Sequence, residues 1–159
     1  MNRVSARAGT VPRSGEISFR SPSGATLKDM RHAVMAIIAE LQSSGFRDDE
    51  ISDAEIVLGE LLSNIVKHAH LGRANGWFFI QVRYSDDALL VECHDNGSAM
   101  PQRRVPDGRF PNTARPTNML PEGGWGWCLI RALSNDICYE RSANENVTRL
   151  VLPIFPSAH

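Results

Sequence analysis

The segment GELLSNIVKHAH, residues 59–70, gathers several chemically capable side chains on what reads as one helix. Glu60, Asn64 and Lys67 fall on neighbouring rows of a helix that turns about 100° per residue, and His68 follows directly. A carboxylate and an amide one turn apart can orient a hydroxyl group or a water and can bind a hard cation such as Mg²⁺. A lysine beside them can meet a phosphate. Taken alone, the segment is equally consistent with a solvated helix face that carries ordinary charges.

A second candidate segment is VECHDNG, residues 91–97. An apolar run ends there in Asp95, and Gly97 follows in what reads as a turn. Aspartate and glycine are common turn residues, so the pattern has a purely structural reading as well. A carboxylate that closes a strand also suits an acceptor aimed at a ligand.

A third candidate is EGGWGWCLI, residues 122–130, in which Gly123, Gly124 and Gly126 precede an apolar helical pattern. Glycines in such a place let backbone N–H groups approach an anion, and a helix N-terminus favours negative charge. A glycine cluster alone is weak support for a phosphate site. The ordered combination of the three segments is much more specific than any one of them.

Hydrophobic periodicity predicts the elements that must position these residues. Helical spacing predicts helices within residues 21–45, 47–70 and 123–135, while residues 98–121 show no period. Alternating or β-branched runs predict strands at residues 16–20, 76–84, 88–95, 136–141 and 147–153, with two hairpins among the last four. Helices on one face of a mostly antiparallel mixed sheet make a two-layer α+β sandwich.

Read in order, the three segments resemble the N box and the two glycine boxes of the GHKL ATPase superfamily of gyrase, heat-shock chaperones, histidine kinases and MutL-type repair proteins. Within it the chain is most similar to the anti-sigma-factor serine kinases, stand-alone proteins of this size. The resemblance covers roughly residues 16–153. It implies the GHKL ATPase fold, with a loose tail at residues 1–14, a single ATP-binding kinase domain at residues 15–155 and a lid loop at about 98–122.

The resemblance also implies roles for the residues of the first segment. Glu60 would be the general base, Asn64 would bind Mg²⁺, and Lys67 and His68 would lie near the phosphates of ATP. In the second segment, Asp95 would accept a hydrogen bond from the adenine amino group.

The remaining implied roles belong to glycines and to the last strand. Gly97 would allow close approach of the base. The backbone of the second glycine box would hold the phosphates, through Gly123, Gly124 and Gly126. Thr148 matches the threonine that supports the adenine-binding aspartate in this family.

Some positions depart from the family pattern. The first glycine box usually reads D-x-G-x-G, whereas Ala99 replaces the second glycine here, and an alanine would strain a turn that needs positive φ. Trp125 and Trp127 are bulkier than is common in the second box, and Val147 stands where a glycine often precedes the threonine. These departures bear on nucleotide affinity more than on the fold.

The predicted lid has an unusual composition, with a proline at every fifth position from Pro101 to Pro121. This spacing suits neither a helix nor a strand, because each proline removes a backbone donor. The segment also carries Arg103, Arg104, Arg109 and Arg115. They fit a solvated loop, or one of them meets the γ-phosphate or an acidic partner.

Composition narrows the remaining possibilities. A length of 159 residues suits one domain, and a net charge of −1 gives no argument for nucleic acid or a membrane surface as partner. Cys93, Cys128 and Cys138 fit neither a disulfide framework nor zinc spacing, so we expect buried thiols in a reducing cytoplasm.

Three functions from different classes remain open. The first is an ATP- and Mg²⁺-dependent protein-serine kinase that phosphorylates a STAS-domain antagonist and also binds a sigma factor or another output protein. The second is a non-catalytic anti-sigma or switch module with a weakened ATP site, which Ala99 favours and the intact Glu60 and Asn64 oppose. The third is the ATP-binding half of a histidine kinase, although such kinases commonly carry Asn where Glu60 stands. A homodimer through the first strand and helix is frequent in the family that the chain resembles.

Overall fold

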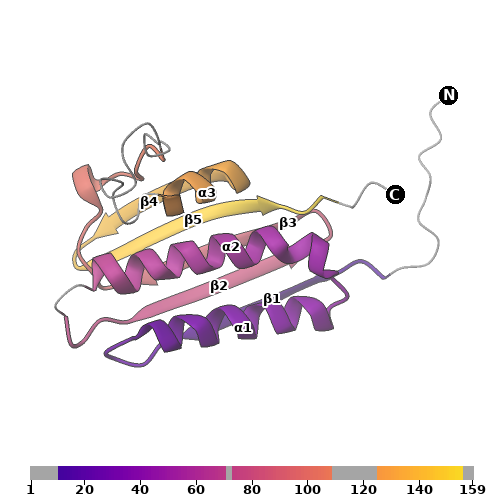
Figure 1. Cartoon of the computed structure of the whole chain (residues 1–159), viewed down its shortest axis with the longest axis horizontal. Coiled ribbons are helices and arrows are strands. Elements are labelled where there is room, and N and C mark those ends of the chain that lie inside the picture. Colours follow the sequence, from indigo (N-terminus) through magenta and orange to yellow (C-terminus); the bar gives the residue numbers. More distant parts are fainter. Residues whose placement is uncertain (1–10, 71–72, 109–124, 156–159) are drawn as a thin grey trace, which may run out of the picture.

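The computed structural model describes residues 11–70, 73–108 and 125–155 (Figure 1). A π-helical segment, Ile65–Ala69, directly continues the second helix, and a short 3-10 turn covers Pro101–Arg103. The regular elements are β1 (Ser14–Arg20), α1 (Leu27–Ser43), α2 (Asp48–Asn64), β2 (Phe78–Ser85), β3 (Ala88–Asp95), α3 (Trp125–Leu133), β4 (Asn135–Ser142) and β5 (Glu145–Pro153). Each strand and helix expected from periodicity is present, with boundaries that differ by a few residues.

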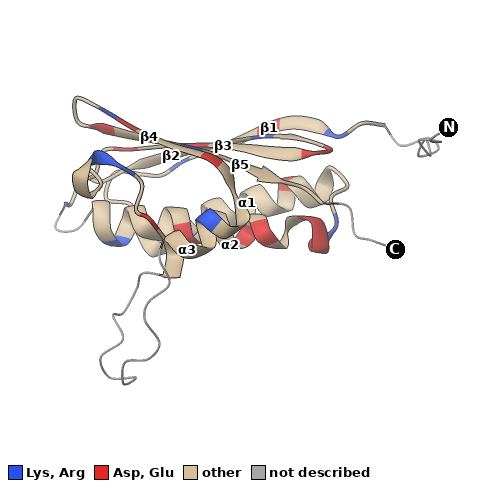
Figure 2. Cartoon of the chain, turned by 90° about the horizontal axis from the view of Figure 1, so that it is seen from above, with Lys and Arg blue, Asp and Glu red and all other residues tan. Residues whose placement is uncertain are grey.

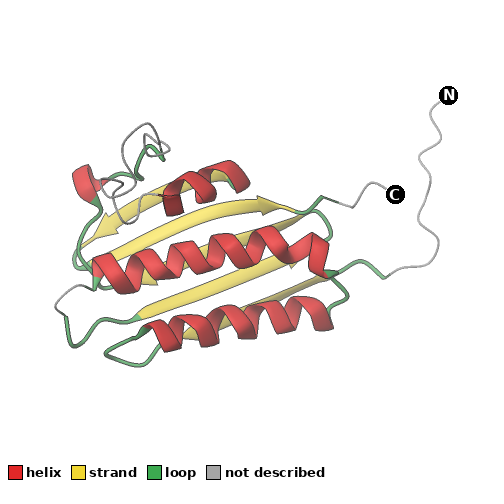
Figure 3. Ribbon diagram, in the orientation of Figure 1, coloured by secondary structure: helices red, strands yellow, loops and turns green. Residues whose placement is uncertain are grey.

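The strands form one sheet in the order β1-β2-β3-β5-β4 (Figure 3). Every neighbouring pair among the described strands is antiparallel, so the sheet is antiparallel rather than mixed. Because the chain reaches the far edge at β4 and returns through β5, β5 lies directly beside β3. This arrangement pairs Asp95 with Asn146 and Cys93 with Thr148, residues that are far apart in the sequence.

The three helices all cover the same face of the sheet, as Figure 2 shows from above. The inward residues of β2, Phe78, Ile80 and Val82, are fully buried, and so are Leu58 and Leu62 of α2. These residues belong to a single hydrophobic core between the two layers. The predicted two-layer α+β sandwich is therefore confirmed.

The opposite face of the sheet carries the outward half of each alternating strand. Glu92 accepts a hydrogen bond from Arg149 at 2.6 Å, and Arg149 also contacts Glu140 at 3.0 Å. Such a ladder of alternating charges is typical of an antiparallel sheet with one wetted face. Cys138 lies on β4 and is exposed, so the expectation of three buried cysteines holds for Cys93 and Cys128 only.

The first helix is delimited by local chemistry. Its N-cap is Thr26, whose side chain accepts from the Asp29 N–H, while the Asp29 carboxylate accepts from the Thr26 N–H at 2.7 Å. This is a reciprocal capping box. After Ser43 the chain turns through Gly45 at φ +89°, a left-handed conformation that favours glycine.

The C-terminal end of α2 widens into the π-helical segment. The His70 N–H donates to the Ile65 carbonyl at 2.9 Å, a bond to the fifth preceding residue. One further contact follows from this widening, because the Ala69 carbonyl accepts from the Ser98 N–H at 2.8 Å. Widened turns of this kind recur at functional sites, and this one joins α2 to the turn after β3.

Arg13 fastens the start of the domain to three other segments. Its Nη1 donates to Glu50 Oε2 at 2.9 Å and its Nε to Asp86 Oδ1 at 2.7 Å, while the guanidinium lies 3.9 Å from the centre of the Phe46 ring. The expected loose tail therefore overlaps the fold at Arg13 and Ser14, and residues 1–10 lie outside the described residues. The Arg13 hydrogen bond, as the largest cause, lowers the pKa of Glu50.

We predict that Arg13→Ala lowers the free energy of unfolding by about 2–3 kcal/mol, because it leaves the nearly buried Glu50 carboxylate without its main partner. The pKa of Glu50 is depressed in the folded state, so this stabilisation is present at neutral pH and is lost as the pH falls below about 4. Urea unfolding of both proteins at several pH values measures the difference.

The matched control is Arg47→Ala, at the start of the same helix. Its ion pair with Asp49 is about half exposed and its Nη1 lies 3.8 Å from Glu50 Oε1, so we expect a clearly smaller loss than for Arg13→Ala. Equal losses for the two variants, or a loss for Arg13→Ala that does not shrink in acid, would contradict the assignment.

Candidate functional site

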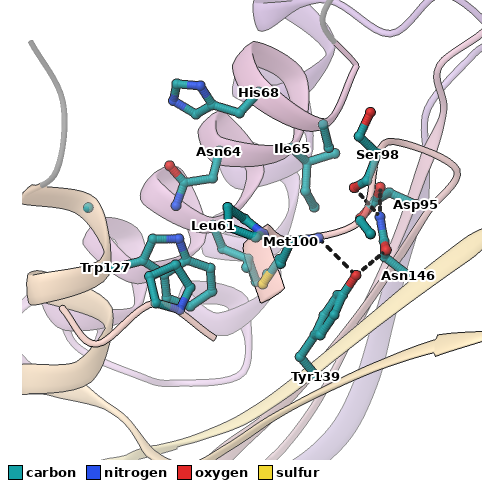
Figure 4. A pocket seen from close by; sticks show the side chains of 15 residues that line it. Leu61, Asn64, Ile65, His68, Asp95, Ser98, Met100, Trp127, Tyr139 and Asn146 are labelled. Atoms are coloured by element: carbon teal, nitrogen blue, oxygen red, sulfur yellow. Dashed lines mark hydrogen bonds between the residues drawn. The ribbon is translucent and has the colours of Figure 1, made fainter. Parts of the chain in front are cut away.

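A cavity of about 400 Å³ lies between the helical layer, the sheet and the start of the predicted lid (Figure 4). It is lined by Leu61, Asn64, Ile65, His68 and Ala69 from α2 and its π-helical extension, Gly126 and Trp127 from α3, Asp95, Tyr139 and Asn146 from the strands, and Ser98, Ala99, Met100, Pro101 and Pro106 from the loop after β3. The walls are mainly apolar, with a few polar groups at defined places. This composition is typical of small-molecule sites.

Glu60 and Asn64 meet the second glycine box at one end of this cavity. A Cβ atom on Gly126 would lie 2.6 Å from Glu60 Oε2 and 3.5 Å from each terminal atom of the Asn64 amide. The absence of a side chain at Gly126 therefore lets α3 approach α2 at these two polar groups. Glu60 stands beside the cavity, whereas Asn64 is part of its lining.

The Asn64 amide has unused hydrogen-bonding capacity. Its Nδ2 is buried and has no hydrogen-bond partner within the described ranges. Leaving a buried amide donor unsatisfied costs free energy, and native proteins rarely do so without reason. A bound group in the cavity could complete the hydrogen bonds of this amide.

The other two polar residues of this helix differ from each other. His68 is exposed and lines the cavity, as expected for a residue near a ligand. Lys67 is exposed and is not part of the described lining.

Asp95 lies at the other end of the cavity and is 3% exposed. Its Oδ1 accepts hydrogen bonds from the Gly97 N–H at 2.8 Å and from Asn146 Nδ2 at 2.9 Å. Burial raises the pKa of this carboxyl, because a charged group loses hydration there, while the two hydrogen bonds oppose the rise. His70, which is also buried, has a pKa that burial lowers.

The residue that supports Asp95 directly is Asn146, and sequence reasoning missed it. The resemblance implies this role for Thr148, which lies opposite Cys93, two positions further along β5. Both residues face inward and are 2% exposed. The signal that could have identified Asn146 is a polar residue in phase with the buried positions of an apolar strand.

Gly97 lies against the end of the π-helical segment. A Cβ atom there would come within 2.4 Å of Ala69 Cβ and 2.6 Å of the Ala69 carbonyl oxygen. The close approach found in the structure is therefore between this turn and the helix. Ala99 is not among the non-glycine residues with positive φ in the described chain, so the strain considered for it is not observed.

The second glycine box is described only in part. Gly123 and Gly124 lie outside the described residues. Gly126 is the second residue of α3 rather than part of a turn before the helix. Of the three glycines predicted to hold phosphates, the structure brings Gly126 into the lining of the cavity.

The described start of the lid, residues 98–108, forms one wall of the cavity. Met100 N–H donates to the Tyr139 hydroxyl at 3.0 Å, and Arg131 Nε of α3 donates to the Pro106 carbonyl at 2.6 Å. Arg103 and Arg104 are exposed, while Arg109 and Arg115 lie outside the described residues. This part of the lid is thus held by β4 on one side and by α3 on the other.

The arrangement can hold an elongated polar ligand at its two ends. A carboxylate acceptor sits at one end and an amide, a carboxylate and a helix-borne glycine at the other, with apolar walls between them. Within the described residues, no cluster of three or more His, Cys, Asp or Glu side chains could hold a metal ion by itself. No helix in the described ranges combines the length and the apolar composition that a membrane span needs.

Comparison with known proteins gives relatives for this arrangement. The serine-protein kinase RsbW of Bacillus cereus strain AH187 is 30% identical over 128 residues, which cover 80% of this chain and 78% of that protein. The serine-protein kinase RsbW of Listeria innocua is 30% identical over 96 residues. Those residues cover 59% of this chain, and the chain spans only 60% of the length of the Listeria protein.

A solved structure shares the fold. The RsbU and RsbW domains of Rv1364c from Mycobacterium tuberculosis match with a TM-score of 0.58 and 15% identity, covering 89% of this chain and 34% of that chain. Residues 23–152 match the family described as the histidine kinase-like ATPase domain, a span that contains the three helices, β2, β3, β4, nearly all of β5 and the residues that line the cavity, but not β1. The chain belongs to the histidine kinase-like ATPase domain family, and it is related to the RsbW serine-protein kinases.

Proposed function

We propose that this chain is an ATP-dependent protein-serine kinase that phosphorylates a STAS-domain antagonist and binds a sigma factor or another output protein in the cytoplasm. The observation that carries the proposal is the meeting of Glu60, Asn64 and Gly126 at one end of a cavity whose other end is Asp95. One end suits the phosphates of ATP and the attacking serine hydroxyl, and the other end suits the adenine ring.

Each part of ATP has a matching wall in this proposal. The adenine amino group would donate to Asp95, and the apolar side chains of the cavity would cover the base. The phosphates would extend toward Gly126 and Asn64, with His68 and Lys67 at the outer side of the helix. The unsatisfied Nδ2 of Asn64 supports this direction, since phosphate oxygens accept hydrogen bonds.

Mg²⁺ fits the donor set at this end. The amide oxygen of Asn64 is a hard ligand, and magnesium is commonly held by one or two protein groups together with substrate phosphates. The ion would neutralise charge that develops on the phosphates. Gly123 and Gly124 are proposed to contribute backbone N–H groups to the same phosphates.

Glu60 would act as the general base. Its carboxylate takes the proton of the serine hydroxyl while the serine oxygen forms a bond to the γ-phosphorus. The bond between that phosphorus and the bridging oxygen breaks, and ADP leaves. The carboxylate lies next to Gly126 beside the cavity, and Glu60 is partly exposed.

The partner part of the proposal has separate support. RsbW proteins are named serine-protein kinases, which supports a protein substrate here. β1 is an edge strand of the sheet, and an exposed edge favours pairing with a second copy of the chain. The alternative of a non-catalytic switch module rested on strain at Ala99, and the backbone at Ala99 gives it no support.

The first prediction is that Glu60→Gln lowers phosphotransfer by roughly 10²-fold or more, the usual effect of removing a positioned base. The amide keeps the size of the side chain, so ATP and partner binding should persist. Asn64→Ala should instead lose Mg²⁺-dependent ATP binding as well as turnover. The assay incubates each protein with Mg-ATP and the STAS protein encoded beside it, and detects phosphoserine by mass spectrometry.

Two outcomes would contradict this assignment. Equal phosphorylation by the wild type and Glu60→Gln would remove Glu60 as the base. Tight binding of the STAS protein with no phosphoserine from either protein would replace the kinase by the switch module.

The second prediction uses a pair of helical glycines. Gly126→Ala places a methyl group 2.6 Å from Glu60 Oε2, so the carboxylate must move and we expect phosphotransfer to fall at least tenfold. Gly59→Ala is the matched control, because a Cβ there meets no atom within 4 Å. It should keep full activity and gain about 0.5–1 kcal/mol of stability, measured by thermal unfolding. Equal activity of the two variants would show that Gly126 does not control Glu60.

The third prediction concerns the recognition of adenine. Asp95→Asn should weaken ATP and ADP alike, because both carry adenine and the new amide can point a donor at the adenine amino group. Isothermal titration calorimetry measures both affinities. An unchanged ADP affinity in the folded variant would remove Asp95 from the site.

A further inference from the structure

The buried amide of Asn146 is the junction between β3, the β4–β5 hairpin and the loop after Gly97 (Figure 4). On one side, its Nδ2 donates to Asp95 Oδ1 at 2.9 Å, to the Ser98 carbonyl at 3.0 Å and to the Gly97 carbonyl at 3.4 Å. All three partners are acceptors. The residue is only 2% exposed, so these groups have little access to water.

On the other side, Asn146 Oδ1 faces donors. It accepts from the Tyr139 hydroxyl at 2.5 Å and from Arg141 Nη1 at 2.8 Å. The Tyr139 hydroxyl in turn accepts from the Met100 N–H at 3.0 Å, so its own proton is available to Asn146. Arg141 also donates to the Gly97 carbonyl at 2.7 Å.

These partners allow only one orientation of the amide. A guanidinium group can only donate, and a backbone carbonyl can only accept. Turned by 180°, the amide would point its NH₂ group at Arg141 and its oxygen at two carbonyls and a carboxylate. Arg141 and Tyr139, together with the carbonyls of Gly97 and Ser98, therefore decide that a donor faces Asp95.

The orientation has a consequence for Asp95. Its Oδ1 already accepts from Asn146 and from the Gly97 N–H, so a proton on this oxygen would face two donors. The carboxyl group is thereby kept as an acceptor at the end of the cavity. Adenine presents a donor amine at its sixth position, whereas guanine presents an acceptor oxygen there.

Building on the proposed ATP site, we propose that Arg141, Tyr139 and Asn146 are positioning residues that hold Asp95 as a hydrogen-bond acceptor, and that this relay makes the cavity select a purine with an amine rather than an oxygen at its sixth position. Arg141 acts from β4, on the far side of Asn146 from the carboxylate. The selection would thus depend on residues that do not themselves meet the amine.

The groups around Asp95 are consistent with a carboxylate that needs such support. His70 faces it from the segment after α2, Arg141 from β4 and Cys93 from its own strand. Burial raises the pKa of Asp95, and it also lowers the pKa of His70 and raises the pKa of Cys93. Arg141 is the permanent positive charge among these neighbours, and it favours the ionised form of Asp95.

The principal test is Asn146→Asp, which has nearly the same shape. One oxygen keeps the hydrogen bonds from Tyr139 and Arg141, but the other faces Asp95 and two carbonyls and needs a proton. We expect ATP affinity at pH 8 to fall about tenfold or more and to recover as the pH is lowered toward 6. The wild type should show no such recovery, because its Asn146 already presents a donor to Asp95 over this pH range.

A second variant, Arg141→Met, removes one of the two donors that face Asn146 Oδ1 and the positive charge next to Asp95. Both changes favour a protonated carboxyl at Asp95, which admits a base with an acceptor oxygen. The ratio of ATP to GTP affinity should fall about tenfold. Arg149→Met is the matched control, since it removes the same charge from the same hairpin on the opposite face of the sheet and should leave the ratio unchanged.

The measurements are calorimetric titrations with Mg-ATP and Mg-GTP between pH 6 and 8, with circular dichroism to verify folding. A merely structural role for Asn146 and Arg141 would lower both affinities together at every pH, and parallel pH profiles with an unchanged ratio would overturn the inference. In that case a wild type that still prefers ATP would leave the proposed function standing. A wild type that binds neither nucleotide would overturn both.

Discussion

Two glycines, Gly97 and Gly126, determine how closely α2 and its π-helical extension approach their neighbours, because neither residue has a side chain. At one end, Gly97 lies so close to Ala69 that an added Cβ would come within 2.4 Å of it. At the other end, a Cβ atom added to Gly126 of α3 would lie 2.6 Å from Glu60 Oε2. The cavity lies between these contacts, with Asp95 near the first and the polar groups of Glu60 and Asn64 at the second. A methyl group at either glycine would push the layers apart or displace the functional side chain.

The polar end at Asp95 shows how a buried network can be both stable and specific. Asn146 uses its donors on acceptors and its acceptor on donors, so its buried amide has partners on both sides. Fully satisfied networks of this kind rigidify a core, whereas partly satisfied ones are costly. The Asn64 amide at the other end is the contrast, because its Nδ2 lacks a partner in the described chain. The cavity is therefore rigid at the end that would bind adenine, and it has an unsatisfied donor at the end that would bind the phosphates.

Local pattern was enough to predict the elements and the two hairpins, but not how the hairpins and β1 join into one sheet. Helical and alternating periods located α1, α2 and the strands, because each buries one face and the period reveals it. The same reasoning predicted a loop between β4 and β5 that is longer than the observed one. The turn is confined to Ala143 and Asn144, with Ala143 at φ 52°, and the residues around it complete the strands. A left-handed alanine has no local sequence signal, so the extra strand length could not be predicted.

The choice between Asn146 and Thr148 illustrates the same limit within the site. Both positions face inward on β5, so alternation alone identifies two candidates and cannot separate them. The register of β5 against β3, fixed by the packing of the whole sheet, sets Asn146 opposite Asp95. The proximity of Glu60 and Asn64 was easier to predict, because the helical repeat places them one turn apart without any tertiary information.

The widened end of α2 connects these two kinds of information. A regular α-helix carries its register unchanged to its last turn, whereas the π-helical segment shifts the following residues by adding one to the turn. After this shift, the Ala69 carbonyl accepts a hydrogen bond from the Ser98 N–H, and the turn after β3 lies against the helix. The helix that bears Glu60 and Asn64 and the strand that ends in Asp95 are thereby joined by main-chain contacts. Since both ends of the cavity contact this one helix and its extension, a movement of α2 would change the geometry of both ends.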